Sequence, residues 1–319
     1  MQIRCCILLT VIALTCSADF AISQSPISNL VEAIRHAELQ SQDPANAQSS
    51  AAWYTLAHLY QDAARYQDAE HAYSKAITLL QPGNRIAFAD ATDSLGTLYV
   101  EVGQYAKAEP LERQALAIRE QQNDLLGTGR SWMHLAMLSL GKHDNAEAAR
   151  YAERAAERLV PERLVPQHAS TTAIQGATPE EKMTALINLS LVRCAQGASP
   201  AALPELHLAR TFAETSQEAA SFPSAILDFL EGYALWKSDN FKAAAQLMKK
   251  GTEGMEAQLG LNHPTCIVSL KQYESFLKQT GQTTEASAIE TRLKRAQAPQ
   301  TQPQLARVTS PSERTTSSR

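Results

Sequence analysis

Two stretches of the chain align without a gap, and this internal repeat constrains the fold more than any other feature of the sequence. The stretch 95–116, "LGTLYVEVGQYAKAEPLERQAL", repeats the pattern of leucine, small residues, tyrosine and alanine found 39 residues earlier in 56–77, "LAHLYQDAARYQDAEHAYSKAI". Each stretch holds two amphipathic runs separated by a short polar turn, which indicates two antiparallel helices. The chain is therefore expected to be built from repeated helix-turn-helix units.

Glycine and proline positions within the second of these units have distinct expected roles. A glycine inside a helix costs roughly 1 kcal/mol relative to alanine, so Gly96 needs a reason to lie in the first helix. Two helices approach closely only where small side chains face each other, and we expect Gly96 to pack against Ala108 of the second helix. Gly103 is expected to end the first helix in a left-handed conformation. Pro110 is expected in the first turn of the second helix, where amide hydrogens have no helical partner.

Further helix pairs follow along the chain. The pair in 186–209 keeps the register and has Pro204 at the place of Pro110, and two more pairs lie in 230–251 and 259–295. The pair in 132–156 can be aligned on Gly141 or on Ala136, which gives registers two residues apart, and both stay open. With 44% hydrophobic but only 6% aromatic residues, the composition suits closely packed helices better than sheets. The sequence predicts an all-α solenoid of about six units.

The first unit resembles the tetratricopeptide repeat (TPR) family. The match in order and spacing to that family's pattern is carried by Trp53, Leu56, Ala57, Tyr60, Ala69, Tyr73 and Ala76. In the second unit Glu112 stands where the family has an aromatic residue. The resemblance covers about 51–295, except 161–179, and implies a right-handed superhelical solenoid.

The last unit resembles the kinesin light chain subtype of these repeats. In that subtype a Leu-Gly-x-x-His-Pro turn joins consecutive units, and it is matched here by Leu259, Gly260, His263 and Pro264. Ser269 and Leu270 match the start of the following helix. The subtype's repeats are slightly longer than usual, as is the spacing between the first two units here.

The N-terminal segment has the layout of a secretory signal peptide. Arg4 precedes an apolar run over 5–14 that is too short to span a bilayer, which takes about 20 residues. Cleavage after Ala18 or after Ser23 is open. Lipid anchoring at Cys16 is disfavoured because threonine precedes it. We therefore expect residues 1–23 to be a signal peptide and the protein to be exported, periplasmic or secreted.

The remaining domain boundaries follow from composition. We expect 24–50 to hold a capping helix (27–39), since solenoid ends need covering. Units one to three occupy 51–160 and units four to six occupy 180–295. Between them, 161–179 contains three prolines and reads as a long loop, either a surface insertion or a functional segment. The tail 296–319 is rich in Pro, Gln, Ser and Thr and is expected to be disordered.

No motif for chemistry is found in the sequence. A net charge of −4 provides no basic field for nucleic acid, and HExxH, paired CxxC, GxxxxGK and GxSxG motifs are missing. The histidines at 36, 58, 71 and 134 show no metal-ligand spacing, and the inter-repeat turn explains His263 beside Cys266. We expect no enzyme activity, no cofactor and no metal, and no feature indicates the oligomeric state.

A binding surface remains as the expected functional site. In such solenoids the first helices of the units line a concave groove that holds the ligand. The groove positions expected to bind a protein or peptide segment are Tyr54, His58, Gln61, Asp93, Thr97, Glu101, Asn188, Tyr233, Lys271, Gln272 and Lys278. The alternative is that these residues form an ordinary solvated helix face.

Family members often hold a peptide backbone or carboxylate with asparagines and lysines at such positions. Only Asn188 matches the asparagine preference, and Lys271-Gln272 replaces an Asn-Asn pair. The resemblance implies a non-catalytic scaffold for protein-protein interaction, and the N-terminal segment adds the expectation that it is exported. The alternative function is an accessory or regulatory domain of an envelope enzyme, or an enzyme with an unrecognised site.

Overall fold

The computed structural model describes residues 36–39, 49–80, 84–161, 176–215 and 222–297. Within these ranges the secondary structure is helical and contains no strand. The predicted signal peptide, most of the predicted capping helix, most of the 161–179 loop and the tail after Gln297 lie outside the described residues. The all-α prediction is confirmed.

The helices are α2 (Ser50–Asp62), α3 (Tyr66–Leu80), α4 (Arg85–Glu101), α5 (Tyr105–Gln121), α6 (Leu125–Gly141), α7 (Asn145–Leu159), α8 (Pro179–Ala195), α9 (Leu203–Thr215), α10 (Phe222–Lys237), α11 (Phe241–Leu259), α12 (Pro264–Gln279) and α13 (Thr283–Gln297). A short 3-10 helix, η4 (Ser199–Ala202), precedes α9.

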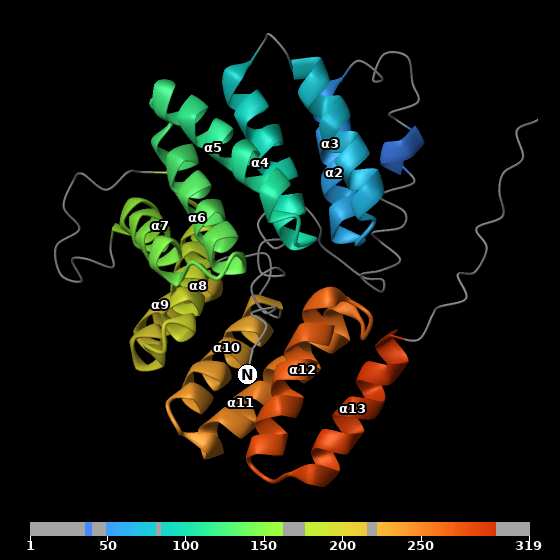
Figure 1. Ribbon diagram of the computed structural model, residues 1–319, viewed down its shortest axis with the longest axis vertical. Coiled ribbons are helices and arrows are strands. Elements are labelled where there is room, and N and C mark those ends of the chain that lie inside the picture. The colour runs from blue at the N-terminus through green and yellow to red at the C-terminus, as the bar shows by residue number, and fades with distance from the viewer. Residues whose placement is uncertain (1–35, 40–48, 81–83, 162–175, 216–221, 298–319) are drawn as a thin grey trace, which may run out of the picture.

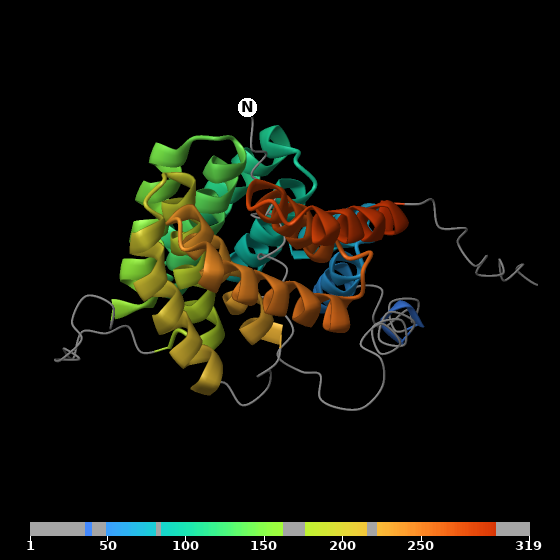
Figure 2. The same cartoon turned by 90° about the horizontal axis from the view of Figure 1, so that it is seen from below.

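Consecutive helices pack as six hairpins, from α2 with α3 to α12 with α13. First helices of neighbouring units also contact one another, since α4 packs on α6, α6 on α8 and α8 on α10. Figures 1 and 2 both show the hairpins following a curved path, with α6–α9 on one side of the molecule and the first and last hairpins on the other. The first helices α4, α6, α8 and α10 thus form a continuous face, as in a repeat solenoid.

The turn inside each unit has a left-handed residue at the same place. In the turns of units one to six, the residue with a positive φ angle is, in order, Ala64, Gly103, His143, Gly197, Asp239 and Gly281. In the second unit the Gly103 N–H donates to the Val100 carbonyl (3.0 Å) and the Gln104 N–H to the Tyr99 carbonyl (2.7 Å), which closes the helix end. The expected role of Gly103 is confirmed.

These turns settle the register of the third unit. His143 has a φ of +65° and donates its N–H to the Leu140 carbonyl, so it corresponds to Gly103, and Ala136 corresponds to Gly96. Gly141 is the last residue of α6, and a Cβ there would lie 2.6 Å from Cε1 of Tyr105. The glycine at 141 therefore serves packing between units and does not form the turn.

Two expectations for the second unit need correction. The atoms nearest to a Cβ built on Gly96 belong to Glu112, with Oε1 at 2.7 Å, so Gly96 chiefly makes room for a carboxylate and not for the Ala108 methyl group. Pro110 lies inside α5, past its first turn, whereas Pro204 does lie in the first turn of α9. Both prolines lie at the same distance from the left-handed glycine of their turns, Gly103 and Gly197, so the sequence alignment holds. The difference arises because η4 precedes α9 and delays its start.

The turn between the last two units shows what each residue of its motif does. Gly260 ends α11 with a φ of +80°. His263 caps α12, because its Nδ1 accepts a hydrogen bond from the Thr265 N–H (3.2 Å). Pro264 opens α12, where a missing N–H is harmless. This structural role accounts for the histidine beside Cys266.

The described part of the predicted capping helix, residues 36–39, contacts the first unit. Glu38 Oε1 accepts hydrogen bonds from Tyr60 Oη (2.7 Å) and from Arg65 Nη1 (3.4 Å). At the other end α13 continues to Gln297, two residues into the predicted tail. Among the described helices, none combines the length and the hydropathy needed to cross a membrane.

Candidate functional site

The groove positions named from sequence lie on the first helices of their units, as expected, but several are buried. Gln61, Asp93, Thr97 and Asn188 are buried. Lys271 and Lys278 on α12 are exposed. The positions in the first five units are therefore buried or partly buried, and only the two lysines of the last unit are exposed.

Hydrogen bonds tie the positions in the first two units to neighbouring helices. Tyr54 Oη lies 3.0 Å from Ser94 Oγ on α4, and His58 Nδ1 lies 2.9 Å from Tyr73 Oη on α3. Gln61 Nε2 donates to Glu101 Oε2 (2.9 Å). Burial lowers the pKa of His58 to about 4. These side chains link the first unit to the second and hold the helix face in place.

The positions in the last two units have a different environment. Tyr233 is half-buried and packs edge-on against Trp236, with ring centroids 5.6 Å apart. Lys278 Nζ forms an ion pair with Glu274 (2.6 Å), and Gln272 is half-buried. The basic end of the first-helix face is thus exposed. Its acidic end is interior, because Asp93 pairs with Arg119 at 2.8 Å and Glu101 accepts the hydrogen bond from Gln61.

Asn188 has an unusual environment at the centre of the first-helix face. Its side chain is 1% exposed, and neither Nδ2 nor Oδ1 has a hydrogen-bond partner among the described residues. A buried polar group without a partner costs about 1–3 kcal/mol. Such a group in a folded protein calls for a structural or functional explanation.

The repeat register explains why Asn188 lacks a partner. It occupies the position that Ser94 and His134 occupy in the second and third units. Those two residues hydrogen-bond to the first helix of the preceding unit, at Tyr54 and Asp93 respectively. In the unit before Asn188 the equivalent position is Met133, whose thioether is only a weak acceptor.

A buried polar network joins the second and third units. Arg119 on α5 is 2% exposed, and its Nη1 donates to Asp93 Oδ2 (2.8 Å) and to Ser131 Oγ (2.6 Å). Its Nη2 donates to Asp90 Oδ1 (2.6 Å). A buried guanidinium is stable only with such charge pairing. Arg119 is not recognisable as a buried residue from the sequence, because nothing in its local pattern distinguishes it from a surface arginine.

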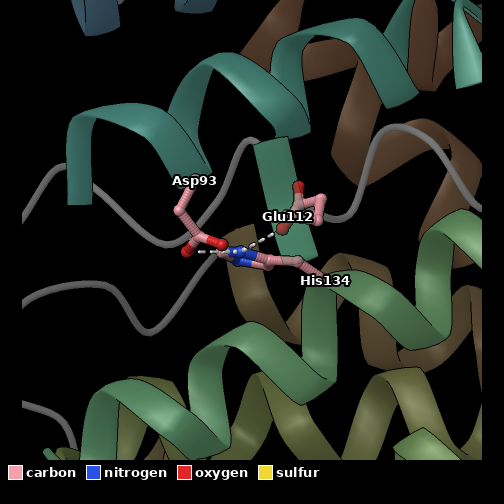
Figure 3. Close-up of side chains that lie close together, drawn as sticks. All are labelled: Asp93, Glu112 and His134. Atoms are coloured by element: carbon pink, nitrogen blue, oxygen red, sulfur yellow. Dashed lines mark hydrogen bonds and ion pairs between the residues drawn. The ribbon is translucent and has the colours of Figure 1, made fainter. Parts of the chain in front are cut away.

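Asp93, Glu112 and His134 converge within this network from three consecutive helices (Figure 3). His134 Nδ1 lies 2.9 Å from Asp93 Oδ2 and 3.8 Å from Glu112 Oε2. One ligand-type atom of each residue lies within 4.8 Å of the others. From the sequence, Asp93 was expected only as a groove position, and His134 showed no metal-ligand spacing. The sequence signal for this cluster was Glu112, which stands where the repeat pattern has an aromatic residue.

The two carboxyl groups of this cluster have opposite pKa shifts. Burial and then the negative charge of Asp93 raise the pKa of Glu112 well above its ordinary value. Burial also disfavours the charged form of Asp93, but the positive charge of Arg119 outweighs it and holds the pKa of Asp93 well below its ordinary range. The arrangement thus favours an ionised Asp93 beside a neutral Glu112.

The Cys/His pair in the last unit is not arranged for nucleophilic catalysis. His263 Nδ1 is occupied by the helix-capping hydrogen bond. Cys266 is buried, and burial raises the pKa of its thiol to about 12, whereas a reactive cysteine needs a lowered pKa. Both residues therefore serve the inter-repeat turn and the core.

Comparisons with known proteins place this architecture. Residues 48–121 match the tetratricopeptide repeat family model, and no curated protein matches the chain. The structure of apo RapI is similar with a TM-score of 0.60 and 15% identity, over 86% of this chain and 92% of that chain. Aspartyl phosphate phosphatase F from Bacillus subtilis has a TM-score of 0.62 and 10% identity, over 86% and 69%.

A kinesin light chain with nearly identical TPR-like repeats from Podosopora anserina has a TM-score of 0.47 and 14% identity, over 66% of this chain and 95% of that chain. The similarity to apo RapI and to aspartyl phosphate phosphatase F shows a shared helical fold and nothing more specific.

Proposed function

We propose that this chain, in which residues 48–121 match the tetratricopeptide repeat family model and helix hairpins follow one another, is a non-catalytic scaffold that binds a protein or peptide segment along the face formed by its first helices. The continuity of α4, α6, α8 and α10 supports this proposal, since stacked repeats form extended binding surfaces. The exposed side chains at the α12 end, above all Lys271, add positive charge there.

The unpaired amide of Asn188 is the observation that carries the proposal. An extended peptide offers one N–H and one C=O per residue, and the Asn188 side chain offers the complementary acceptor and donors. Pairing them recovers the free energy that the free protein loses by burying this amide. Because Asn188 is 1% exposed, the side chains that cover it must move for a segment to reach it.

A peptide selection with matched variants tests this function. Ligands selected from a displayed peptide library on the wild-type protein are titrated calorimetrically against Asn188→Ala and against Gln114→Ala, an exposed amide on the second-helix face. Loss of the paired hydrogen bonds should weaken binding by about tenfold in Asn188→Ala, with no change in Gln114→Ala. Equal affinities in both variants would place binding elsewhere.

We also propose that the scaffold acts outside the cytoplasm. The support is the sequence of the N-terminal segment, with Arg4 ahead of an apolar run over 5–14. N-terminal sequencing of protein recovered from the cell envelope or medium should give a mature start at Asp19 or Gln24. Recovery of the chain only from the cytoplasm, with residues 1–23 intact, would contradict export.

A further inference from the structure

The cluster of Asp93, Glu112 and His134 has the donor atoms of a metal site. Each residue comes from a different helix, α4, α5 or α6, and the chosen ligand atoms lie within 4.8 Å of one another. Donors bound to one zinc ion lie about 2.0–2.2 Å from the metal, so a modest contraction of these side chains would bring all three to a single ion.

An unused atom points into the centre of this cluster. Glu112 is fully buried, yet its Oε2 has no hydrogen-bond partner in the described part of the chain. Figure 3 shows this carboxylate directed at the His134 ring. Its other oxygen, Oε1, accepts a hydrogen bond from Thr97 Oγ1 (3.3 Å). A buried acceptor aimed at another ligand-type atom is what a bound cation would satisfy.

The charged groups around the cluster leave one oxygen of Asp93 available to a divalent ion. Arg119 is held by Asp90 through Nη2 and by Asp93 through Nη1, and it uses only Oδ2 of Asp93. Asp93 Oδ1 accepts a long hydrogen bond of 3.5 Å from Ser131 Oγ and stays available to an ion. Glu112 is neutral in the free protein because burial and Asp93 raise its pKa, and a bound ion would displace its proton. Ionised Asp93 and Glu112 would then face the two positive charges of the ion.

The donor set also indicates which ions suit the site. One imidazole with two carboxylates is a mixed nitrogen and oxygen set, which favours divalent transition metals over Mg²⁺ or Ca²⁺. The Arg119 and Thr97 hydrogen bonds would orient the two carboxylates, as outer partners do in metal sites. The His134 side chain is 13% exposed, so an ion can enter at this residue.

We propose that Asp93, Glu112 and His134 bind a divalent transition metal of the zinc type, and that the ion joins the second and third repeat units. The site needs Gly96, because a larger residue there would occupy the space of the Glu112 carboxylate. The bound ion would hold the first helices α4 and α6 together along the face proposed for peptide binding.

Zinc binding by the purified chain tests the proposal. After chelator treatment, calorimetric titration with Zn²⁺ should show one saturable site, and Zn²⁺ but not Mg²⁺ should raise the melting temperature. Glu112→Gln and His134→Gln should each lose this saturable binding. His71→Gln, which removes an exposed histidine of the first unit, should retain it. Cobalt(II) should give a visible ligand-field spectrum that the same two variants lose.

The proposal would be overturned if the wild-type protein has no saturable zinc site, or if Glu112→Gln and His134→Gln bind zinc as tightly as the wild-type protein does. The cluster would then be a polar network without a metal. If both variants lose their helical circular dichroism, crystals of the wild-type protein soaked in zinc decide instead. An anomalous peak between the three side chains supports the site, and its absence there rejects it.

Discussion

Oε1 of Glu112 lies 2.7 Å from the point that a Cβ atom would occupy on Gly96. The glycine in the first helix of the second unit and the carboxylate in its second helix therefore fit each other. Glu112 replaces the aromatic residue that the repeat pattern expects, and its carboxylate extends across the helix interface toward Thr97 and His134. This pair determines both the stability of the unit and the cluster behind it.

Gly96→Ala should destabilise the protein by about 1–3 kcal/mol, because the new methyl group overlaps a buried carboxylate. Helix propensity alone predicts the opposite sign, a gain of roughly 1 kcal/mol. Urea unfolding followed by circular dichroism distinguishes the two. The loss of unfolding free energy caused by Gly96→Ala should be smaller in a Glu112→Ala background. An equal loss in both backgrounds would show that the effect of Gly96→Ala does not depend on Glu112.

Arg119→Met should cost about 3–5 kcal/mol, because Asp93 would then be a buried charge without its cation. The matched control is Arg113→Met on the same helix, whose side chain is 49% exposed, and a change within about 0.5 kcal/mol is expected there. Denaturant midpoints of the two variants and the parent provide the comparison. Similar midpoints for both variants would mean that the Arg119 network contributes little.

His58 should make the protein less stable as the pH falls from neutral. Burial lowers the pKa of its imidazole from 6.5 to about 4, so the unfolded chain binds a proton between these values while the folded chain does not. The unfolding free energy therefore decreases through this window, by at most about 3 kcal/mol. His58→Gln should have a shallower pH dependence between pH 6.5 and 4, measured by urea titrations. Parallel curves would exclude His58 as the source.

Asn188→Leu should stabilise the unliganded protein by about 1–3 kcal/mol, since it replaces an unpaired buried amide with an apolar side chain of similar size. A higher melting temperature, together with weaker binding of a selected peptide, is the expected combination. A lower melting temperature would show that the amide has partners in solution.

The sequence alone determined the repeat architecture. Gly103 marks a unit turn because a left-handed residue is a local requirement of the backbone. The Leu259–Pro264 turn is formed by residues with their own local roles as cap and helix start. Hydrophobic spacing identified the helix pairs for the same reason, since a buried helix face depends on positions three and four residues apart.

Only the tertiary structure decided which side chains meet. Two registers of the third unit differed by two residues, and at 3.6 residues per turn that difference rotates a helix face by about 200°. His134 could not be assigned to the cluster until His143 was seen in the turn. The packing of α4, α5 and α6 brings together Arg119, Asp93 and Glu112. Contacts between side chains on separate helices depend on the rotation of each helix and on the distance between helices, which no local sequence pattern encodes.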